Sequence, residues 1–217
     1  METKQKVLIS VIVVGLIVIG YIAYMNYLGI KGDPEYKEQI QEDAQQYLNE
    51  TYDETITVVD VLHDNMDIYQ EFTYAAIAEI EGNDDFRILV FRDRETGEMI
   101  DSIVAETWEH ELETFLNPIL DDAFGDIVNE VWIVYQKDIG ERLNISPDNI
   151  PSLGGQDDAH PVIRITLDRA KEDDDEEKLD DIIEMLKNDL NLSRGNITIT
   201  YNDNALLFKS KSIMKEI

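Results

Sequence analysis

The segment from Val7 to Leu28, VLISVIVVGLIVIGYIAYMNYL, most constrains what this chain can fold into, because it contains no charged residue. A helix of this length rises 1.5 Å per residue and spans the roughly 30 Å hydrocarbon core of a bilayer. The apolar part of a cleaved signal peptide is shorter, at about 7–15 residues. Tyr21, Tyr24 and Tyr27 line the far end of the run, as in an interfacial aromatic belt. We therefore predict an uncleaved transmembrane helix, with a cleaved signal or a buried core helix as the alternatives.

The charges that flank this segment predict its orientation. Lys4 and Lys6 precede it, whereas Lys31, which follows it, is succeeded at once by acidic residues. Positively charged flanks stay in the cytoplasm. We expect a single-pass protein of the cell membrane with a cytoplasmic tail at residues 1–6 and an extracytoplasmic remainder; only Lys31 favours the opposite orientation.

The remainder is strongly acidic. The chain carries 18 Lys and Arg against 47 Asp and Glu, a formal net charge of −29. Such a surface repels nucleic acid and anionic lipid, and it favours cations or basic partners, although it also serves solubility alone. The absence of cysteine excludes disulfides, thiol chemistry and a lipidated cysteine anchor. This composition is typical of an extracytoplasmic bacterial protein.

The segment after the predicted membrane helix favours an α+β domain at residues 34–143. Asp33 followed by Pro34 is a good helix entry, and apolar residues recur at helical spacing up to Tyr52. Runs rich in β-branched and aromatic residues follow, separated by turn sequences around Gly82 and Gly97. We expect four antiparallel strands after this helix.

A second helix is predicted at residues 105–126, where Pro118 is expected to kink or divide it. Its apolar stripe consists of Trp108, Leu112, Phe115, Leu116, Ile119 and Leu120. Residues 127–139 read as a strand. The stretch at 144–160 is rich in proline and glycine, which predicts a linker between domains.

Beyond the linker, residues 161–217 predict a β-α-β-β domain. A strand at 162–168 precedes an acidic segment, and the run at 196–210 predicts a hairpin that turns at Asn202–Asn204. If Glu130–Lys137 pairs with this sheet, the order becomes strand, strand, helix, strand, strand. The predicted fold class is α+β: a transmembrane helix, then an ectodomain of two packed α+β parts with antiparallel sheets.

The acidic segment from Lys171 to Leu190 has the densest run of potential metal ligands in the chain. A calcium loop of the EF-hand type requires a glycine that is missing here. A helical face instead unites Leu179, Ile182, Ile183, Leu186 and Leu190, with Met185 at its edge. We predict an amphipathic helix whose acids, residues 173–177, form a solvated first turn that favours the helix dipole. Weak binding of divalent cations is the alternative.

Histidine chemistry has little support. His110 in WEHELETF resembles the start of the zinc-protease pattern H-E-x-x-H, but Thr114 stands where the second histidine belongs. His63 and His160 lie at the edges of predicted strands or loops. We predict no metal-ligating residue.

Nucleophile and phosphate motifs also fail. Ser152 precedes Gly154 and Gly155 in the predicted linker, and a Ser/His/Asp arrangement inside one loop is sterically implausible. The two glycines lack the spacing of a phosphate-binding loop. Close carboxylate pairs arise by chance in so acidic a chain. We predict no catalytic and no cofactor-binding residue, and no cofactor.

Three segments carry a resemblance to a known family: GIKGDPEY, AQQYLNETYDETITVVDV and FRILVFRDRETGEMIDSIVAETWEHELETFL. In them the chain resembles the YfjL-like membrane-anchored proteins of Gram-positive bacteria, over most of its length. The middle stretch with GEMIDS also resembles PepSY-type modules, a family linked to the inhibition of secreted proteases. Neither resemblance implies site residues.

These observations favour a non-catalytic interaction module at the outer membrane face, held by Val7–Leu28 and binding an unknown envelope protein. The alternatives are an envelope hydrolase that uses carboxylates, which requires two acids of different environment in one pocket, and an acidic surface that binds cations.

Overall fold

The computed structural model describes Tyr24, Gly29 and residues 31–156, 158–203 and 211–217. The predicted transmembrane segment Val7–Leu28, apart from Tyr24, lies outside these residues. Within the described part of the chain, no helix combines the length and the apolar character that a membrane crossing needs.

The chain forms two compact units. The first contains the described residues up to Asp85 together with Val90–Met99, and the second contains Phe86–Leu89 and Ile100–Ile217. The stretch at 144–160, predicted as a linker between domains 34–143 and 161–217, therefore falls inside the second unit, where Leu153 and Ala159 are buried. Proline and glycine disfavour strands and long helices in such a stretch, but they leave its apolar side chains free to pack.

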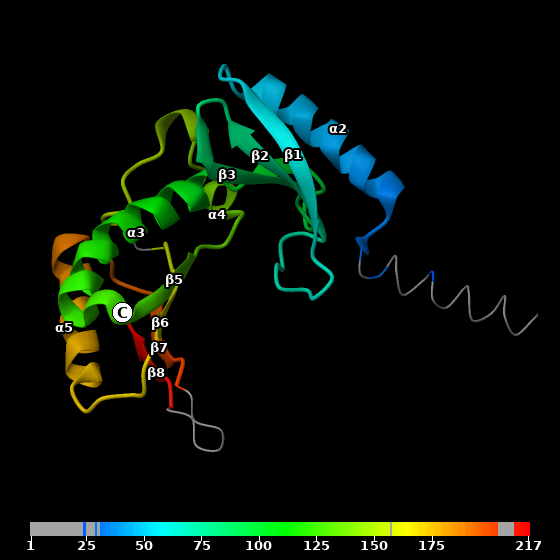
Figure 1. The fold of residues 1–217 in the computed structure, drawn as a ribbon. Coiled ribbons are helices and arrows are strands. Elements are labelled where there is room, and N and C mark those ends of the chain that lie inside the picture. The colour runs from blue at the N-terminus through cyan, green and yellow to red at the C-terminus, as the bar shows by residue number, and fades with distance from the viewer. Residues whose placement is uncertain (1–23, 25–28, 30, 157, 204–210) are drawn as a thin grey trace, which may run out of the picture. The chain divides into compact units, whose positions relative to one another are not determined.

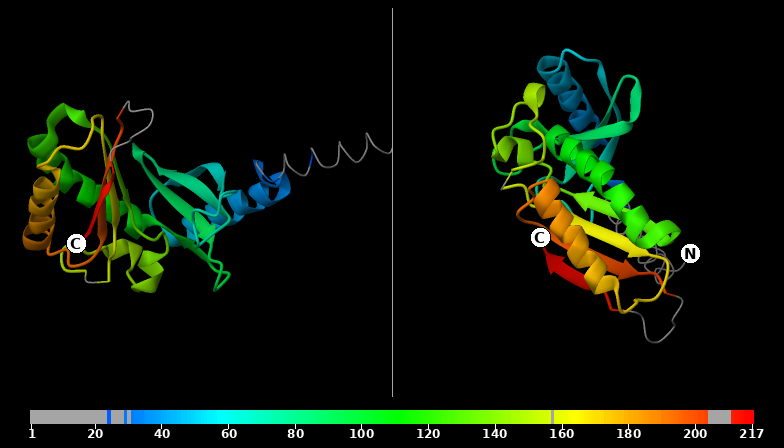
Figure 2. Two further views of the ribbon diagram at one scale, coloured as in Figure 1. Left: turned by 90° about the horizontal axis from the view of Figure 1, so that it is seen from below. Right: turned by 90° about the vertical axis from the view of Figure 1, so that its left-hand side faces the viewer.

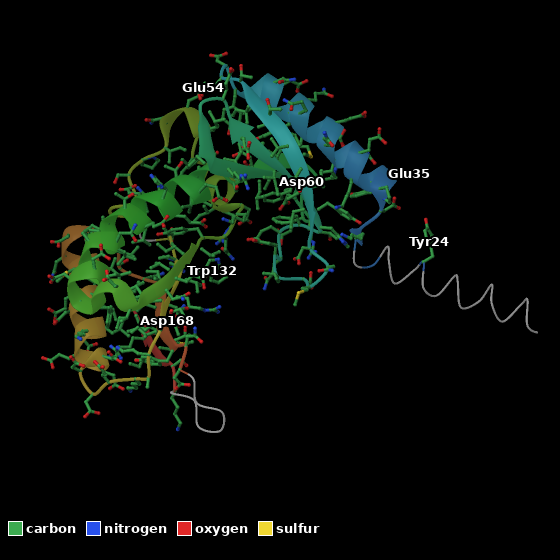
Figure 3. The ribbon with its side chains drawn as sticks, in the orientation of Figure 1. Tyr24, Glu35, Glu54, Asp60, Trp132 and Asp168 are labelled. Carbon is green, nitrogen blue, oxygen red and sulfur yellow. The ribbon has the colours of Figure 1, made fainter. Side chains whose placement is uncertain are left out.

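The first unit is built around one helix and a four-stranded sheet (Figure 1). Its elements are α2 (Pro34–Thr51), β1 (Ile56–His63), β2 (Tyr74–Ile80), β3 (Asn83–Arg92) and β4 (Met99–Asp101), with sheet order β1-β2-β3-β4. Phe86–Leu89 of β3 and the last two residues of β4 are counted with the second unit. The helix begins as predicted: the Asp33 carboxylate accepts the Glu35 N–H at 2.9 Å, with Pro34 in the first turn. Glu35 marks this end of α2 in Figure 3.

The second unit runs strand, strand, helix, strand, strand after the long helix, which the sequence analysis places in the first domain instead. The order is the one expected if Glu130–Lys137 pairs with this sheet, but its last strand, Ile213–Glu216, follows the expected hairpin at 196–210. Its elements are α3 (Ile103–Phe124), η1 (Gly125–Ile127), β5 (Val128–Val134), α4 (Ile139–Arg142), η2 (Pro147–Asn149), β6 (Val162–Leu167), α5 (Asp175–Asp189), β7 (Asn196–Tyr201) and β8 (Ile213–Glu216). The sheet order is β5-β6-β7-β8. Figure 2 shows α3 and α5 on the same face of this sheet, where the core lies.

The expectation of purely antiparallel sheets is wrong for one strand pair. β6 and β7 are parallel, with Val162 opposite Asn196 and Leu167 opposite Tyr201. The reason is the connection: α5 carries the chain back to the end at which β6 began, and a crossover of this kind joins parallel strands. The second sheet is therefore mixed. Its edge strand β8 pairs antiparallel with β7, and the second arm of the hairpin predicted at 196–210 lies outside the described residues.

Pro118 is expected to kink or divide the long helix, and the division does not occur. α3 continues through Pro118 as one element. Proline removes one backbone donor, which leaves the carbonyl of Thr114 without its helical partner. Both residues are exposed, so water can satisfy that carbonyl. The predicted apolar stripe packs into the core at Trp108, Leu112, Leu116 and Leu120, whereas Phe115 and Ile119 are half-buried.

Candidate functional site

A groove of about 380 Å³ lies between the C-terminal half of α3 and the helix α5. The side chains that line it are Pro118, Ile119, Asp122 and Ala123 from α3, and Lys178, Asp181, Ile182 and Met185 from α5. Most of this lining is apolar and the rest is charged. The groove, which we call the α3–α5 groove, belongs entirely to the second unit.

Helical periodicity explains why apolar side chains line this groove. On α5 the core stripe buries Ile182 and Leu186, while Met185 lies beside the stripe and keeps 41% of its surface exposed. On α3 Ile119 lies next to the buried Leu120 in the same way and is half-buried. Each helix thus carries apolar residues at the edge of its buried face, and the two edges border one groove.

The charged residues of the groove differ in whether their charge is paired: Lys178 faces an acid, whereas Asp122 and Asp181 are exposed. Lys178 forms an ion pair with Asp174, with 3.0 Å between nitrogen and oxygen, and its ammonium group lies 5.5 Å from the centre of the Phe124 ring. Asp122 and Asp181 are exposed carboxylates. Because the lysine already faces an acid, the rim of the groove presents a net negative charge to a partner.

A buried polar cluster lies on the N-terminal half of α3. Lys137, 6% exposed, donates from Nζ to Glu106 Oε1 and Glu109 Oε1, each at 2.8 Å. Glu109 also accepts the Tyr135 N–H at 2.8 Å, and Glu106 accepts the Ser102 hydroxyl at 3.1 Å. The cluster fastens the chain that follows β5 onto α3.

One lysine faces two carboxylates in this cluster, and the pKa values of Glu109 and Lys137 are both raised. Burial raises the pKa of Glu109 to about 7; Lys137 opposes this shift and the neighbouring Glu106 adds to it. Burial lowers the pKa of Lys137, but Glu106 and Glu109 outweigh it, so this pKa is raised. Neither glutamate lines the α3–α5 groove.

The predicted solvated first turn of α5 holds one residue that the prediction misplaces. Asp175 is fully buried: Arg169 donates to both of its carboxylate oxygens, and Tyr201 Oη and the Glu172 N–H donate to Oδ2 at 2.9 and 2.8 Å. Burial acts to raise the pKa of Asp175, but these donors lower it to about 2. Among five adjacent acids, nothing in the sequence distinguishes Asp175; only the preceding Arg169 could have indicated an ion pair. The other four acids are exposed, as predicted.

The same turn holds the one group of metal-type ligands found among the described residues. Carboxylate oxygens of Glu172, Asp174 and Asp175 lie within 4.8 Å of one another. A cation there would compete with the guanidinium of Arg169, which already occupies both oxygens of Asp175. The arrangement is that of an ion pair which fixes the start of α5.

The three histidines lie in separate places. His110 is exposed on α3, and His160 is exposed just before β6. His63, at the end of β1 in the first unit, stacks on Tyr74 with 4.5 Å between ring centroids. Among the described residues, no group of potential metal ligands contains a histidine.

Ser152 is hydrogen-bonded to the carboxylate of Glu111. Its hydroxyl donates a short hydrogen bond to Glu111 Oε1, and the N–H of Leu153 donates to Glu111 Oε2 at 2.9 Å. Trp108 Nε1 donates to the carbonyl of Pro151 at 2.9 Å. These bonds fasten the loop to α3, and Gly154 and Gly155 are exposed beside it.

The first unit has a hollow of about 280 Å³ that contains two arginines. Arg92 donates to Asp43 and to the carbonyl of Gly97, both at 2.8 Å. Arg94 donates to Asp67, to the Thr73 hydroxyl and to the carbonyl of Gln70. Both guanidinium groups are thus engaged within the protein.

No family model matches this chain, and no curated protein matches it either. Among solved structures, the chain is similar to a crystal structure of a DUF5037 family protein from Ruminococcus gnavus at 15% sequence identity, with a TM-score of 0.36. The match covers 76% of this chain and 75% of that one. The resemblance to YfjL-like and PepSY-type families stays a prediction.

Proposed function

We propose that this chain is a non-catalytic interaction module, anchored in the cell membrane by Val7–Leu28, whose α3–α5 groove binds a basic and apolar segment of an envelope protein. The apolar lining with exposed acids at its rim carries the proposal. An amphipathic helix that lays apolar residues into such a groove is a recurring mode of peptide recognition. Lysine or arginine beside those residues would complement Asp122 and Asp181 and the net charge of −29.

An envelope hydrolase that uses carboxylates has less support. Glu106 and Glu109 form a pair of acids in different environments, but Lys137, Ser102 and the backbone of Tyr135 occupy their oxygens. A general acid or base must reach the proton that it transfers. The pair serves better as a structural clamp, and the exposed acids serve better as the rim of a binding surface than as a cation store.

Site-specific photo-crosslinking in membranes tests the groove. A benzophenone amino acid replaces Met185 at the groove or, as a matched control, Met214 on β8, which is 70% exposed. Position 185 should give an adduct that position 214 does not give, and mass spectrometry should locate the crosslink in a partner segment with apolar residues beside Lys or Arg.

Charge reversal separates specific binding from chance collision. D122K with D181K should reduce the adduct at position 185 several-fold, since it turns the rim repulsive toward a basic segment. E113K with E141K, at exposed acids outside the groove lining, should leave it unchanged. Equal adducts from positions 185 and 214, or an adduct insensitive to the reversal, would contradict the proposal.

A further inference from the structure

The loop between β1 and β2, residues 64–73, carries apolar side chains at its tip. Met66 is 76% exposed and Ile68 is 62% exposed. Loop tips in soluble domains are mostly polar, and a pair of large exposed apolar residues marks a surface that meets something else. We call this segment the β1–β2 loop.

Hydrogen bonds to side chains brace the backbone of the loop. The Asp64 carboxylate accepts the N–H groups of Met66 and Tyr69 at 3.2 and 2.7 Å. Arg94 donates to the Asp67 carboxylate and to the carbonyl of Gln70 at 3.1–3.2 Å. Because these bonds organise the backbone in advance, burying the tip against a partner loses little conformational entropy.

The base of the loop is also the place where the chain enters the first unit. The Asp64 N–H donates to the carbonyl of Thr73 at 2.8 Å and closes the loop. Tyr74 Oη accepts the N–H of Asp33 at 2.9 Å. Gly32 packs so closely on Tyr74 that an added Cβ would lie 2.8 Å from its ring. Figure 1 shows the loop and the start of α2 at the same end of β1.

This position brings the loop close to the proposed membrane anchor. Three residues lie between Leu28 and Gly32, and the four steps from one Cα to the next span at most about 14 Å when fully extended. Two residues lie between the loop base at Asp64 and Asp67, and the three steps from one Cα to the next allow a reach of at most about 10 Å. The polar interface on one side of a bilayer is about 5–8 Å thick, so a loop with a reach of up to about 10 Å is long enough to enter it from a base next to the anchor.

We infer that the β1–β2 loop is a second membrane contact, whose tip residues Met66 and Ile68 enter the outer interface of the lipid bilayer. The inference rests on the proposed anchor at Val7–Leu28. Paired charges favour it: Arg94 neutralises Asp67, and Lys37 lies at the loop base, where Nζ donates to the carbonyl of Val61 at 3.2 Å. The apolar tip, rather than a basic patch, makes the contact, so zwitterionic lipid suffices.

The absence of cysteine makes the test direct. The full chain with M66C or I68C is labelled with the environment-sensitive dye NBD and reconstituted into phosphatidylcholine vesicles. The matched control is E54C, which precedes β1 at the end opposite the loop (Figure 3). The strand between them has 8 residues, which corresponds to about 23 Å.

The expected result is a blue-shifted NBD emission at positions 66 and 68 that doxyl-labelled lipids quench several-fold more strongly than emission at position 54. I68D in the M66C background should reduce this quenching, whereas V59D, at an exposed residue of β1, should not. Emission at position 66 that matches position 54 would overturn the inference. A blue shift without lipid quenching would also overturn it, because the tip would then contact a protein or a second copy of this chain.

Vesicle flotation of the same samples distinguishes this failure from failure of the anchor. A chain that floats with the vesicles but shows no quenching at position 66 retains the anchor and loses the loop contact. A chain that does not float contradicts the proposed anchor, and the loop inference falls with it.

Discussion

Two buried glutamates share one lysine on the N-terminal half of α3, and this imbalance makes Glu109 sensitive to pH near neutrality. Its pKa is raised from the usual 4.5 to about 7, so the folded protein holds a proton that the unfolded chain releases between these values. The stabilisation that follows is present below about pH 4.5 and is lost as the pH rises through about 7.

We therefore expect E109Q to remove one source of pH dependence. Relative to this variant, the wild type should lose on the order of 2 kcal/mol of unfolding free energy between about pH 4.5 and 7.5. Urea denaturation at a series of pH values measures the difference. E113Q, at an exposed residue of the same helix, is the control. Curves for wild type and E109Q that run parallel would refute the buried titration.

The pKa of Asp175 is shifted in the opposite direction from that of Glu109. Its pKa is lowered to about 2, so its stabilisation is present above about pH 3.8 and is lost as the pH falls through about 2. D175N should destabilise the protein by about 3 kcal/mol at neutral pH, because the largely buried guanidinium of Arg169 is left without its anion. D174N, at an exposed residue, should have little effect. Thermal or urea melts compare the two, and equal destabilisation would mean that Asp175 is not buried as described.

At the scale of an element, α5 shows how one helix serves two surfaces. Its inner face buries Leu179, Ile182, Ile183 and Leu186, while its edge with Met185 borders the α3–α5 groove. Substitutions on the two faces should therefore separate folding from binding.

I183D should destabilise the second unit by about 3–5 kcal/mol, since it places an unpaired carboxylate in the core. M185D should leave the fold intact, because the side chain is largely exposed. Circular dichroism melts measure both effects. A similar loss of stability in M185D would show that the groove is closed in solution.

For the whole molecule, the net charge of −29 predicts a stability that depends on salt. Raising NaCl from about 10 mM to about 500 mM shortens the Debye length from about 30 Å to a few ångströms and should raise Tm by several degrees.

Calcium at the same ionic strength should raise Tm no more in the wild type than in D174N, because Arg169 already occupies the carboxylate of Asp175. A calcium-specific rise that is lost in D174N would instead identify a cation site at the start of α5.

Local patterns allowed much of the secondary structure to be predicted. Asp33 and Pro34 determine where α2 begins, since capping and a fixed φ act within a few residues. The stripe on α5 follows from helical period alone. The alternation of strands and helices also predicts the strands and the helix of the second unit as far as β7, whereas the last strand, β8, lies beyond the expected hairpin at 196–210. The helical period also placed Met185 at the edge of the apolar face of α5. It could not predict that Met185 borders a groove with Ile119, because the sequence near α5 does not indicate which helix packs beside it.

Only the tertiary structure decided which elements pair and which charges are buried. β5 pairs with β6 across the Pro- and Gly-rich stretch that the sequence reads as a linker, and β6 lies parallel to β7. Asp175 meets Tyr201 from 26 residues away, and Lys137 meets Glu106 from 31 residues away. The chain sequence by itself determined its local conformations and its overall charge, because these depend on neighbouring residues and on composition. Strand pairing and the burial of charged side chains depend on which distant segments of the chain pack against one another. They were therefore decided only in the folded molecule.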